Sequence, residues 1–350
     1  MKYTKVHIEA LAYELPPVVV TSEELEERLA PLFKKLHIPS GQLLQWTGIT
    51  ERRWWDAGHE LSQGAIAAAR KALSGSGVPA RDLEALIYAG VCRENFEPAT
   101  ACRVAASLGV NPRASVYDVS NACLGVLNGI VDIANRIELG QLRAGMVVSC
   151  ESAREIVERT IDRMLERPEM DLFKSSVATL TGGSGAVAVL LTDGSYSTSK
   201  RRRLLGGENM AAPEHYGLCR WGLQKMTSLG THVATQVMTT DSPLVLKYGV
   251  DLGLRTWLSF LGHVGWATEQ VDKVICHQVG SGHQNSILKT LGIAPEKDFV
   301  TYPYLGNIGT VSLPLTAALA EERAFLKAGD RVGFLGIGSG LNCMMLGIEW

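Results

Sequence analysis

Tyr117-Asp-Val-Ser-Asn-Ala-Cys-Leu-Gly-Val-Leu-Asn-Gly129 is the stretch around which the rest of the chain is organised. The apolar, β-branched run 115–119 predicts a strand, and the apolar periodicity of 124–137 predicts a buried helix. Cys123 therefore lies where a strand ends and a helix begins. Because the N–H groups and dipole of a helix start favour a thiolate, we expect a lowered pKa and a nucleophile. The alternative is a buried structural cysteine.

Composition excludes several classes of protein. The 350 residues carry 20% charged side chains and a formal net charge of −2, so no basic field is present to hold nucleic acid or an anionic membrane. The seven cysteines are odd in number and form no C-x-x-C pair, which favours a reducing compartment over a disulfide framework or a zinc site. No apolar run approaches the length of a membrane span, and the first residues lack an apolar signal core. We expect a cytoplasmic protein without a metal or cofactor.

The remaining chain alternates between strand and helix signals. Thr21-Ser-Glu-Glu24 predicts a helix start with capping-box chemistry. The other expected elements are a strand within 1–20, helices at 61–73 and 154–167, a strand at 83–91, and an irregular segment at 196–245.

An internal repeat divides the chain. Residues 73–89 align without a gap with 261–277, at an offset of 188. Three shorter matches follow in the same order. One has an offset of 183, one has an offset of 184, and the third pairs the Gly-rich turns near residues 182 and 338. We therefore expect two copies of one α/β unit, residues 1–195 and 196–350. The segments at about 151–180 and 196–245 break the repeat and are candidates for caps, tunnel walls or subunit contacts.

The repeat also makes a geometric prediction about three polar residues. At an offset of 184, Cys123 corresponds to Asn307 in Gly306-Asn-Ile-Gly309. His277 follows the strand that is equivalent to the one ending near Ala89. Because reactive groups gather at the carboxyl ends of strands in α/β sheets, we expect Cys123, His277 and Asn307 to meet in one cleft.

A Cys, a distant His and an Asn form a general nucleophile set. Papain-like proteases also use it, but their cysteine lies near the mature N-terminus in a motif that is absent here. The chain instead resembles the thiolase superfamily and, within it, the ketoacyl synthase III-type condensing enzymes. This resemblance implies a five-layered αβαβα fold of two related halves. The motifs that carry it are Asn121-Ala-Cys-Leu-Gly, Ile275-Cys-His-Gln, Gly306-Asn-Ile-Gly, Thr47-Gly-Ile-x-x-Arg-Arg and Gly336-Ile-Gly-Ser-Gly.

A further motif narrows the resemblance. Phe96-Glu-Pro-Ala-Thr100, Leu218-Cys-Arg220 and the ending 338–350 are similar to the acyl-CoA condensing enzymes of bacterial long-chain olefin synthesis. In those enzymes a glutamate at the place of Glu97 enters the active site of the neighbouring subunit of a homodimer. The alternative for Glu97 is a solvated loop carboxylate.

The resemblance implies a non-decarboxylative Claisen condensation of two acyl-CoAs. Cys123 would carry the first acyl chain, Glu97 would remove the α-proton of the second acyl-CoA, and His277 with Asn307 would stabilise the enolate. The product would be a 2-alkyl-3-ketoalkanoic acid. The oxyanion hole would consist of main-chain N–H groups of Cys123, Gly338, Ser339 and Gly340.

Three alternatives remain open. A decarboxylating ketoacyl synthase III, which uses a malonyl thioester, would share Cys123, His277 and Asn307 but would not need Glu97. A hydroxymethylglutaryl-CoA synthase-like enzyme uses a Cys, a His and a Glu in less similar motifs. A non-catalytic acyl-binding subunit is disfavoured because all three polar residues are retained.

Other predictions concern the surroundings of the site. Arginine pairs well with phosphate, so Arg52, Arg53, Arg201 and Arg202 are candidates for the CoA phosphates, although 200–203 is also typical of a solvated turn. We interpret His283 as structural or cleft-lining, and the other six cysteines as buried. Expected partners are long-chain acyl-CoA substrates, a second copy of the chain and downstream olefin-pathway enzymes.

Overall fold

The computed structural model describes residues 1–196, 202–228 and 231–350, with only the main chain at 225–228 and 231–233. Nine of its described strands form one large mixed sheet in two parts. In the first part the order is β5-β4-β6-β7-β1, and in the second it is β11-β12-β13-β8. The pair His7↔Arg203 joins β1 to β8. The strands are β1 (His7–Glu14), β4 (Ala85–Ala89), β5 (Ser115–Val119), β6 (Ala144–Glu151), β7 (Gly185–Thr192), β8 (Arg203–Ala211), β11 (Lys273–Cys276), β12 (Arg331–Gly338) and β13 (Asn342–Glu349).

The two parts of the sheet repeat one topology. In each part a central parallel pair, β4–β6 or β11–β12, continues into an antiparallel neighbour, β7 or β13. A single parallel bridge, Val274↔Asp298, stands in the second part where β5 stands in the first. Gly77 and Gly265, which are 188 residues apart, end equivalent helices with the same φ of 72°. The fold thus contains two related halves, while the division at residue 195 stays a prediction.

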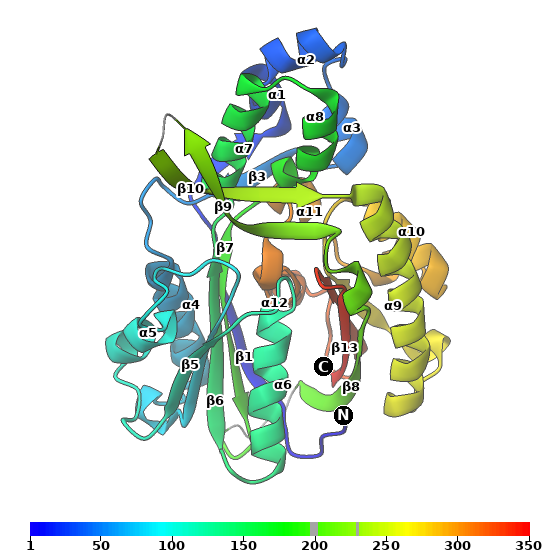
Figure 1. The fold of residues 1–350 in the computed structure, drawn as a ribbon. Helices are drawn as coiled ribbons and strands as arrows, with labels where there is room; N and C mark the ends of the chain where they lie inside the picture. Colours follow the sequence, from blue (N-terminus) through cyan, green and yellow to red (C-terminus); the bar gives the residue numbers. More distant parts are fainter. Residues whose placement is uncertain (197–201, 229–230) are drawn as a thin grey trace.

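Helices cover and separate the two parts of the sheet in five layers (Figure 1). α4 (Leu61–Ser76) and α5 (Thr100–Leu108) pack on the outer face of the first part, in one apolar cluster with β4 and β6. α6 (Gly125–Glu138) and α12 (Ser312–Glu322) form the central layer, in a cluster with strands of both parts. α9 (Ser242–Val264) and α10 (Ser281–Leu291) cover the second part. This is the expected αβαβα thiolase arrangement.

A separate helical cap stands above the sheet layers (Figure 1). Its own apolar cluster joins the N-terminal helices to the 151–180 segment through residues such as Phe33 and Phe173. The predicted capping box is confirmed, because Thr21 Oγ1 accepts the N–H of Glu24 and the Glu24 carboxylate accepts the N–H of Thr21. The cap elements are β2 (Val18–Thr21), α1 (Ser22–Arg28), α2 (Ala30–Leu36), α3 (Gln42–Thr47), β3 (Glu51–Trp54), α7 (Arg154–Glu166) and α8 (Met170–Ser176).

The structure corrects two expectations. The segment 196–245 is not irregular, because its described part contains β8 and a hairpin of β9 (Cys219–Ser228) and β10 (Thr231–Thr240). The hairpin lies directly below the cap and extends toward α9 (Figure 1). Of the six cysteines expected to be buried, Cys102 is exposed, since it lies on the outward face of α5, and Cys92 and Cys219 are half-buried.

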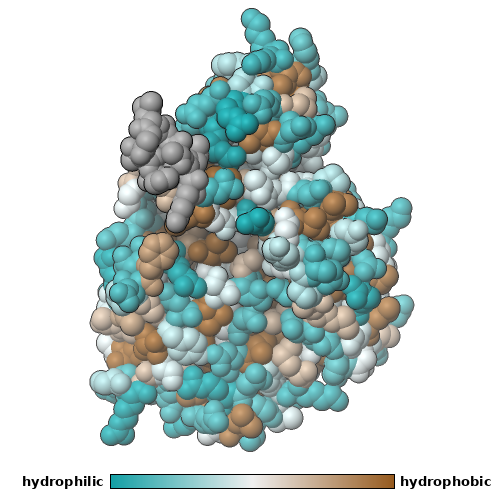
Figure 2. Space-filling view, in the orientation of Figure 1, coloured by the Kyte–Doolittle hydropathy of each residue, from teal (hydrophilic) through white to brown (hydrophobic). Residues whose placement is uncertain are grey.

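Figure 2 shows a face on which hydrophilic side chains predominate and apolar ones are scattered between them. Within the described ranges, no helix combines the length and the apolar character that crossing a bilayer requires. The 23-residue helix α9 is the longest in the outer layers, and it buries one side against β8 and β13 instead.

Candidate active site

Cys123 lies on a tight turn between β5 and α6, as the sequence predicts. Ala122 adopts a φ of 44°, in the left-handed region that a residue with a Cβ rarely occupies. The N–H of Leu124 donates to the carbonyl of Asn121 at 2.9 Å and closes the turn. Strained backbone of this kind gathers at functional sites, because the surrounding structure must hold it in place. The turn therefore sets Cys123 at the head of α6.

The prediction that the helix start lowers the pKa of Cys123 is wrong. Burial first, and then neighbouring Cys219 and Glu151, raise the pKa of the Cys123 thiol to about 12. Desolvation penalises the thiolate and outweighs the helix start, whose influence is limited to its first turn. At neutral pH the free protein thus holds a thiol that needs a base.

His277 follows β11 and is fixed by its main chain, whose N–H donates to the carbonyl of Leu335 at 2.9 Å. Burial, and next the neighbouring His283, lower the pKa of His277 to about 4. Within the described residues its Nδ1 is buried without a hydrogen-bond partner. A neutral imidazole with a free acceptor nitrogen can take up the proton of a thiol.

Asn307 stands before α12, after the short helix α11 (Tyr302–Leu305). Its N–H donates to the carbonyl of Thr181, and its carbonyl accepts the N–H of Gly183, each at 2.8 Å. Its side-chain Oδ1 accepts the N–H of Gly309 at 3.1 Å. Because Oδ1 is already used, the NH₂ group is the part of the amide that is left to donate to a substrate oxygen.

The three polar residues line one cavity of about 170 Å³. Strands and helices from both halves supply them, as the repeat predicts. Gly338 and Ser339 also line the cavity, whereas Gly340 lies behind them in the turn. The rest of the wall is largely apolar and includes Val245, Leu246, Val250, Ile287, Ile337 and Met345. Such an apolar lining suits a hydrocarbon chain.

The β12–β13 turn approaches the nucleophile closely. A methyl group at Gly338 would lie 3.3 Å from the main-chain nitrogen of Cys123, so a side chain here would crowd that nitrogen. Asn342 donates from Nδ2 to Oδ1 of Asn121 at 3.1 Å and ties the two turns together. The β12–β13 turn therefore lies beside the main-chain nitrogen of Cys123, as the predicted oxyanion hole requires.

Glu97 does not reach the Cys123 cavity of its own chain. It lies on the exposed segment between β4 and α5, next to Phe96, which is 94% exposed. It lines a separate surface groove with Trp221 and Gln236 of the β9–β10 hairpin. Within one chain, the site has a nucleophile, a histidine and an amide but no carboxylate at the cavity wall formed by the described residues.

The structure argues against two of the arginines as CoA ligands. Arg52 is 1% exposed and donates to Ser22 Oγ at 2.9 Å, so a phosphate cannot reach it. Arg202 pairs with Glu321 at 2.9 Å, at the opposite end of the strands from Gly338. Arg53, which donates to the carbonyl of Pro16, is partly exposed and stays a prediction. Arg201 lies outside the described residues.

Sequence reasoning missed two residues near the site. Thr310 accepts the N–H of Val126 on Oγ1 at 2.8 Å, and the offset of 184 between them was the signal that could have revealed the contact. Glu151 is buried and accepts the N–H groups of Val91 and Cys92. Its place at the carboxyl end of a buried strand was the available signal.

Comparisons with known proteins agree with this geometry. The family model described as 3-oxoacyl-[acyl-carrier-protein (ACP)] synthase III C terminal matches residues 261–350. The chain is 60% identical to an acyl-CoA:acyl-CoA alkyltransferase of Shewanella oneidensis and 36% identical to one of Xanthomonas campestris pv. campestris, over 100% of both chains in each case.

Solved structures are also similar to this chain over nearly its whole length. Cerulenin-bound Xanthomonas campestris OleA superposes with a TM-score of 0.93 at 35% identity, over 100% of this chain and 98% of that chain. A cysteine-to-serine variant of the same protein with bound lauric acid and lauroyl-CoA gives a TM-score of 0.92 at 35% identity, over 99% and 100%. Other structures of OleA carry substitutions of a glutamate or a histidine.

Proposed function

The chain belongs to the family of acyl-CoA:acyl-CoA alkyltransferases, and from this premise we propose how its own residues divide the reaction. It is a thiolase-fold acyltransferase that joins two fatty acyl-CoAs by Claisen condensation. We assign the acyl carrier to Cys123. The observation that carries this assignment is the single apolar cavity in which Cys123, His277 and Asn307 meet.

In the first step, the sulfur of Cys123 attacks the carbonyl carbon of an acyl-CoA. Because the pKa of His277 is lowered to about 4, its imidazole is neutral in the free protein and can accept the thiol proton as the C–S bond forms. The negative charge that develops on the carbonyl oxygen is stabilised by main-chain N–H groups of Cys123 and the Gly338–Gly340 turn. The CoA thiolate leaves and takes the proton from His277.

In the second step, another acyl-CoA enters and loses an α-proton to Glu97. His277 and the NH₂ group of Asn307 donate to the thioester oxygen as the enolate forms. The α-carbon then attacks the carbonyl carbon of the Cys123 thioester, the bond to sulfur breaks, and Cys123 leaves as a thiolate. Loss of the proton from Glu97 and protonation of this thiolate restore both groups. Addition of water to the remaining CoA thioester releases CoA and the 2-alkyl-3-ketoalkanoic acid.

Glu97 acts in a second copy of the chain in this scheme. The support is that the single chain leaves it exposed, outside its own cavity, next to the solvent-facing ring of Phe96. The protein would therefore work as a homodimer on long-chain acyl-CoAs and pass its product to downstream enzymes. The seven free cysteines fit a reducing, cytoplasmic setting.

Complementation of two variants tests both assignments. Cys123→Ala and Glu97→Gln should each abolish condensation, while Glu97→Gln still releases CoA as Cys123 is acylated. Co-expressed, the two chains should recover up to about half of the wild-type activity per heterodimer, because one of its two sites has both Cys123 and a glutamate. Failure of the heterodimer to condense would refute catalysis in trans, and unimpaired condensation by Glu97→Gln would remove Glu97 as the base.

A further inference from the structure

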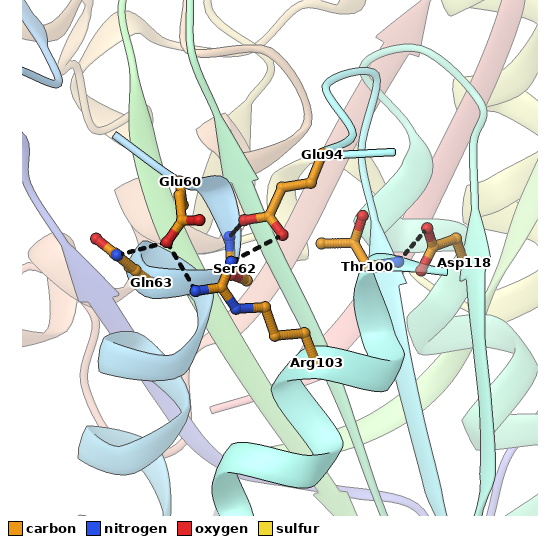
Figure 3. Close-up of polar contacts among 7 residues, drawn as sticks. All are labelled: Glu60, Ser62, Gln63, Glu94, Thr100, Arg103 and Asp118. Atoms are coloured by element: carbon orange, nitrogen blue, oxygen red, sulfur yellow. Dashed lines mark hydrogen bonds and ion pairs between the residues drawn. The ribbon is translucent and has the colours of Figure 1, made fainter. Parts of the chain in front are cut away.

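The segment 90–99, which joins β4 to α5 and carries Glu97, is fastened at both ends by carboxylates. At its start, Glu151 accepts the N–H of Val91 at 2.9 Å and that of Cys92 at 3.1 Å, one on each oxygen. At its end, Asp118 accepts the N–H groups of Thr100 and Ala101, each at 2.9 Å. The second of these clamps is visible in Figure 3 as the contact between Asp118 and Thr100.

A third contact holds the middle of the segment. Glu94 accepts the N–H of Ser62 at the start of α4 at 2.7 Å and pairs with Arg103 of α5 at 3.5 Å (Figure 3). Between Asn95 and Pro98 the segment is exposed. Its tip therefore projects from a base that is tied to two helices and two strands.

Glu151 is the most deeply placed of these anchors. It is 4% exposed, and the hydroxyl of Tyr88 lies within hydrogen-bond distance of the carbonyls of both Cys92 and neighbouring Cys150. Hydrogen bonds from N–H groups to a buried carboxylate are stronger than those between neutral groups. Burial raises the pKa of Glu151, and its two N–H donors oppose that rise.

The same side chain also borders the Asn307 loop. A methyl group at Gly309 would lie 3.4 Å from Cγ of Glu151, so the glutamate packs against the glycine whose N–H donates to Oδ1 of Asn307. Glu151 thus lies between the segment that presents the base and the loop that holds the amide. The condensation step uses both groups, whereas acylation of Cys123 uses neither of them directly.

We propose that Glu151 is a positioning residue for condensation, because its two accepted N–H bonds set the direction in which the segment 90–99 presents Glu97. This inference rests on the proposed function. Displacement of a reacting group by about 1 Å can cost on the order of 100-fold in rate. Substitution of Glu151 should therefore slow condensation without slowing the acylation of Cys123.

Glu151→Gln tests the assignment. Glutamine has the same shape but only one acceptor oxygen, so its NH₂ group must face Val91 or Cys92 and that bond is lost. Because Glu151 is one of the groups that raise the pKa of Cys123, its neutral replacement should not slow acylation of Cys123, followed as CoA release in a single turnover. The kcat for condensation should fall about 100-fold while KM changes little.

Glu138→Gln is the matched control. Glu138 also accepts two main-chain N–H groups, those of Thr4 at 2.8 Å and Lys5 at 3.0 Å, but at the far end of α6 from the cavity. Its substitution should leave both steps unchanged. Asp118→Asn loosens the other end of the segment and should reproduce the split between acylation and condensation even where Glu151→Gln fails to fold.

Each outcome decides one point. If Glu151→Gln condenses acyl-CoAs as fast as the wild type, the positioning role is overturned. If Glu151→Gln does not fold, the same result with Asp118→Asn overturns it. Equal loss of acylation and condensation in a folded Glu151→Gln protein also overturns it, since the residue would then act on Cys123. Absence of condensation in the wild type would instead count against the proposed function.

Discussion

The hydroxyl oxygen of Thr310 accepts the main-chain N–H of Val126 at 2.8 Å, across the centre of the molecule. The two residues are 184 positions apart, which is the spacing between Cys123 and Asn307. The contact joins the starts of α6 and α12, the two helices of the central layer. It shows why a nucleophile from one half and an amide from the other line the same cavity.

Removal of this hydroxyl should destabilise the protein. Thr310→Val keeps the shape of the side chain but leaves the buried N–H of Val126 without its acceptor, at a cost of about 1–3 kcal/mol. Thr310→Ser retains the acceptor and should lose less. Urea denaturation of the three proteins measures the difference, and a valine variant as stable as the wild type would contradict this role.

The reactivity of Cys123 should depend steeply on pH. Because burial raises its pKa to about 12, the thiolate fraction in the free protein rises about tenfold for each pH unit across the neutral range. Alkylation of Cys123 by iodoacetamide, followed by peptide mass spectrometry, should therefore accelerate from pH 7 to pH 9 without a plateau. A plateau below pH 8 would show that the helix start dominates after all.

Asp298 should make the stability depend on pH in an unusual direction. Burial raises its pKa from 3.8 to about 6, although Gln284 donates to it. Between these values the folded state binds more protons than the unfolded state, so this group's contribution falls as pH rises and is lowest above pH 6. Relative to wild type, Asp298→Asn should gain about 3 kcal/mol between pH 4 and pH 6 and then stay level.

Denaturant titrations of both proteins at several pH values check this sign. Subtraction of the wild-type curve from that of the variant removes the groups they share, His277 among them. A difference that stays constant from pH 4.5 to pH 7 would mean that Asp298 is charged throughout.

The length of the acyl chain should depend on α9. Gly253 lines the cavity, and a methyl group there would lie 2.8 Å from Cδ1 of Ile287 on α10, which also lines it. Gly253→Val should therefore lower activity with tetradecanoyl-CoA about tenfold relative to octanoyl-CoA. Gly262→Val on the same helix faces open space and is the control for helix propensity. Equal losses of activity with both substrates would contradict a role of Gly253 in limiting the length of the acyl chain.

Local pattern and repetition were enough to place the core of the site. The strand, turn and helix around Cys123 are confirmed, and the offset between the halves brought Asn307 and His277 to the same cavity because equivalent strands end at the same edge. The same reasoning found the capping box at Thr21. These features depend on neighbours in the sequence or on an exact repeat of them.

The wrong predictions concern properties that depend on contacts between segments distant in the sequence. The pKa of Cys123 depends on the cavity walls from β10 and α9, which no local motif describes. Arg52 faces Ser22 rather than solvent because β2 and β3 pair within the cap. The hairpin β9–β10 escaped notice because its strands mix charged and apolar residues, and its place over the cavity is a tertiary effect.

Incubation of the purified protein with a single long-chain acyl-CoA, without any malonyl thioester, tests the central claim most directly. Mass spectrometry should detect a β-keto acid with both chains, or the ketone it gives on loss of CO₂, and neither should form with Cys123→Ala. If Cys123 is acylated but product forms only after malonyl-CoA or malonyl–carrier protein is added, the reaction is decarboxylative, and the non-decarboxylative condensation described here is wrong.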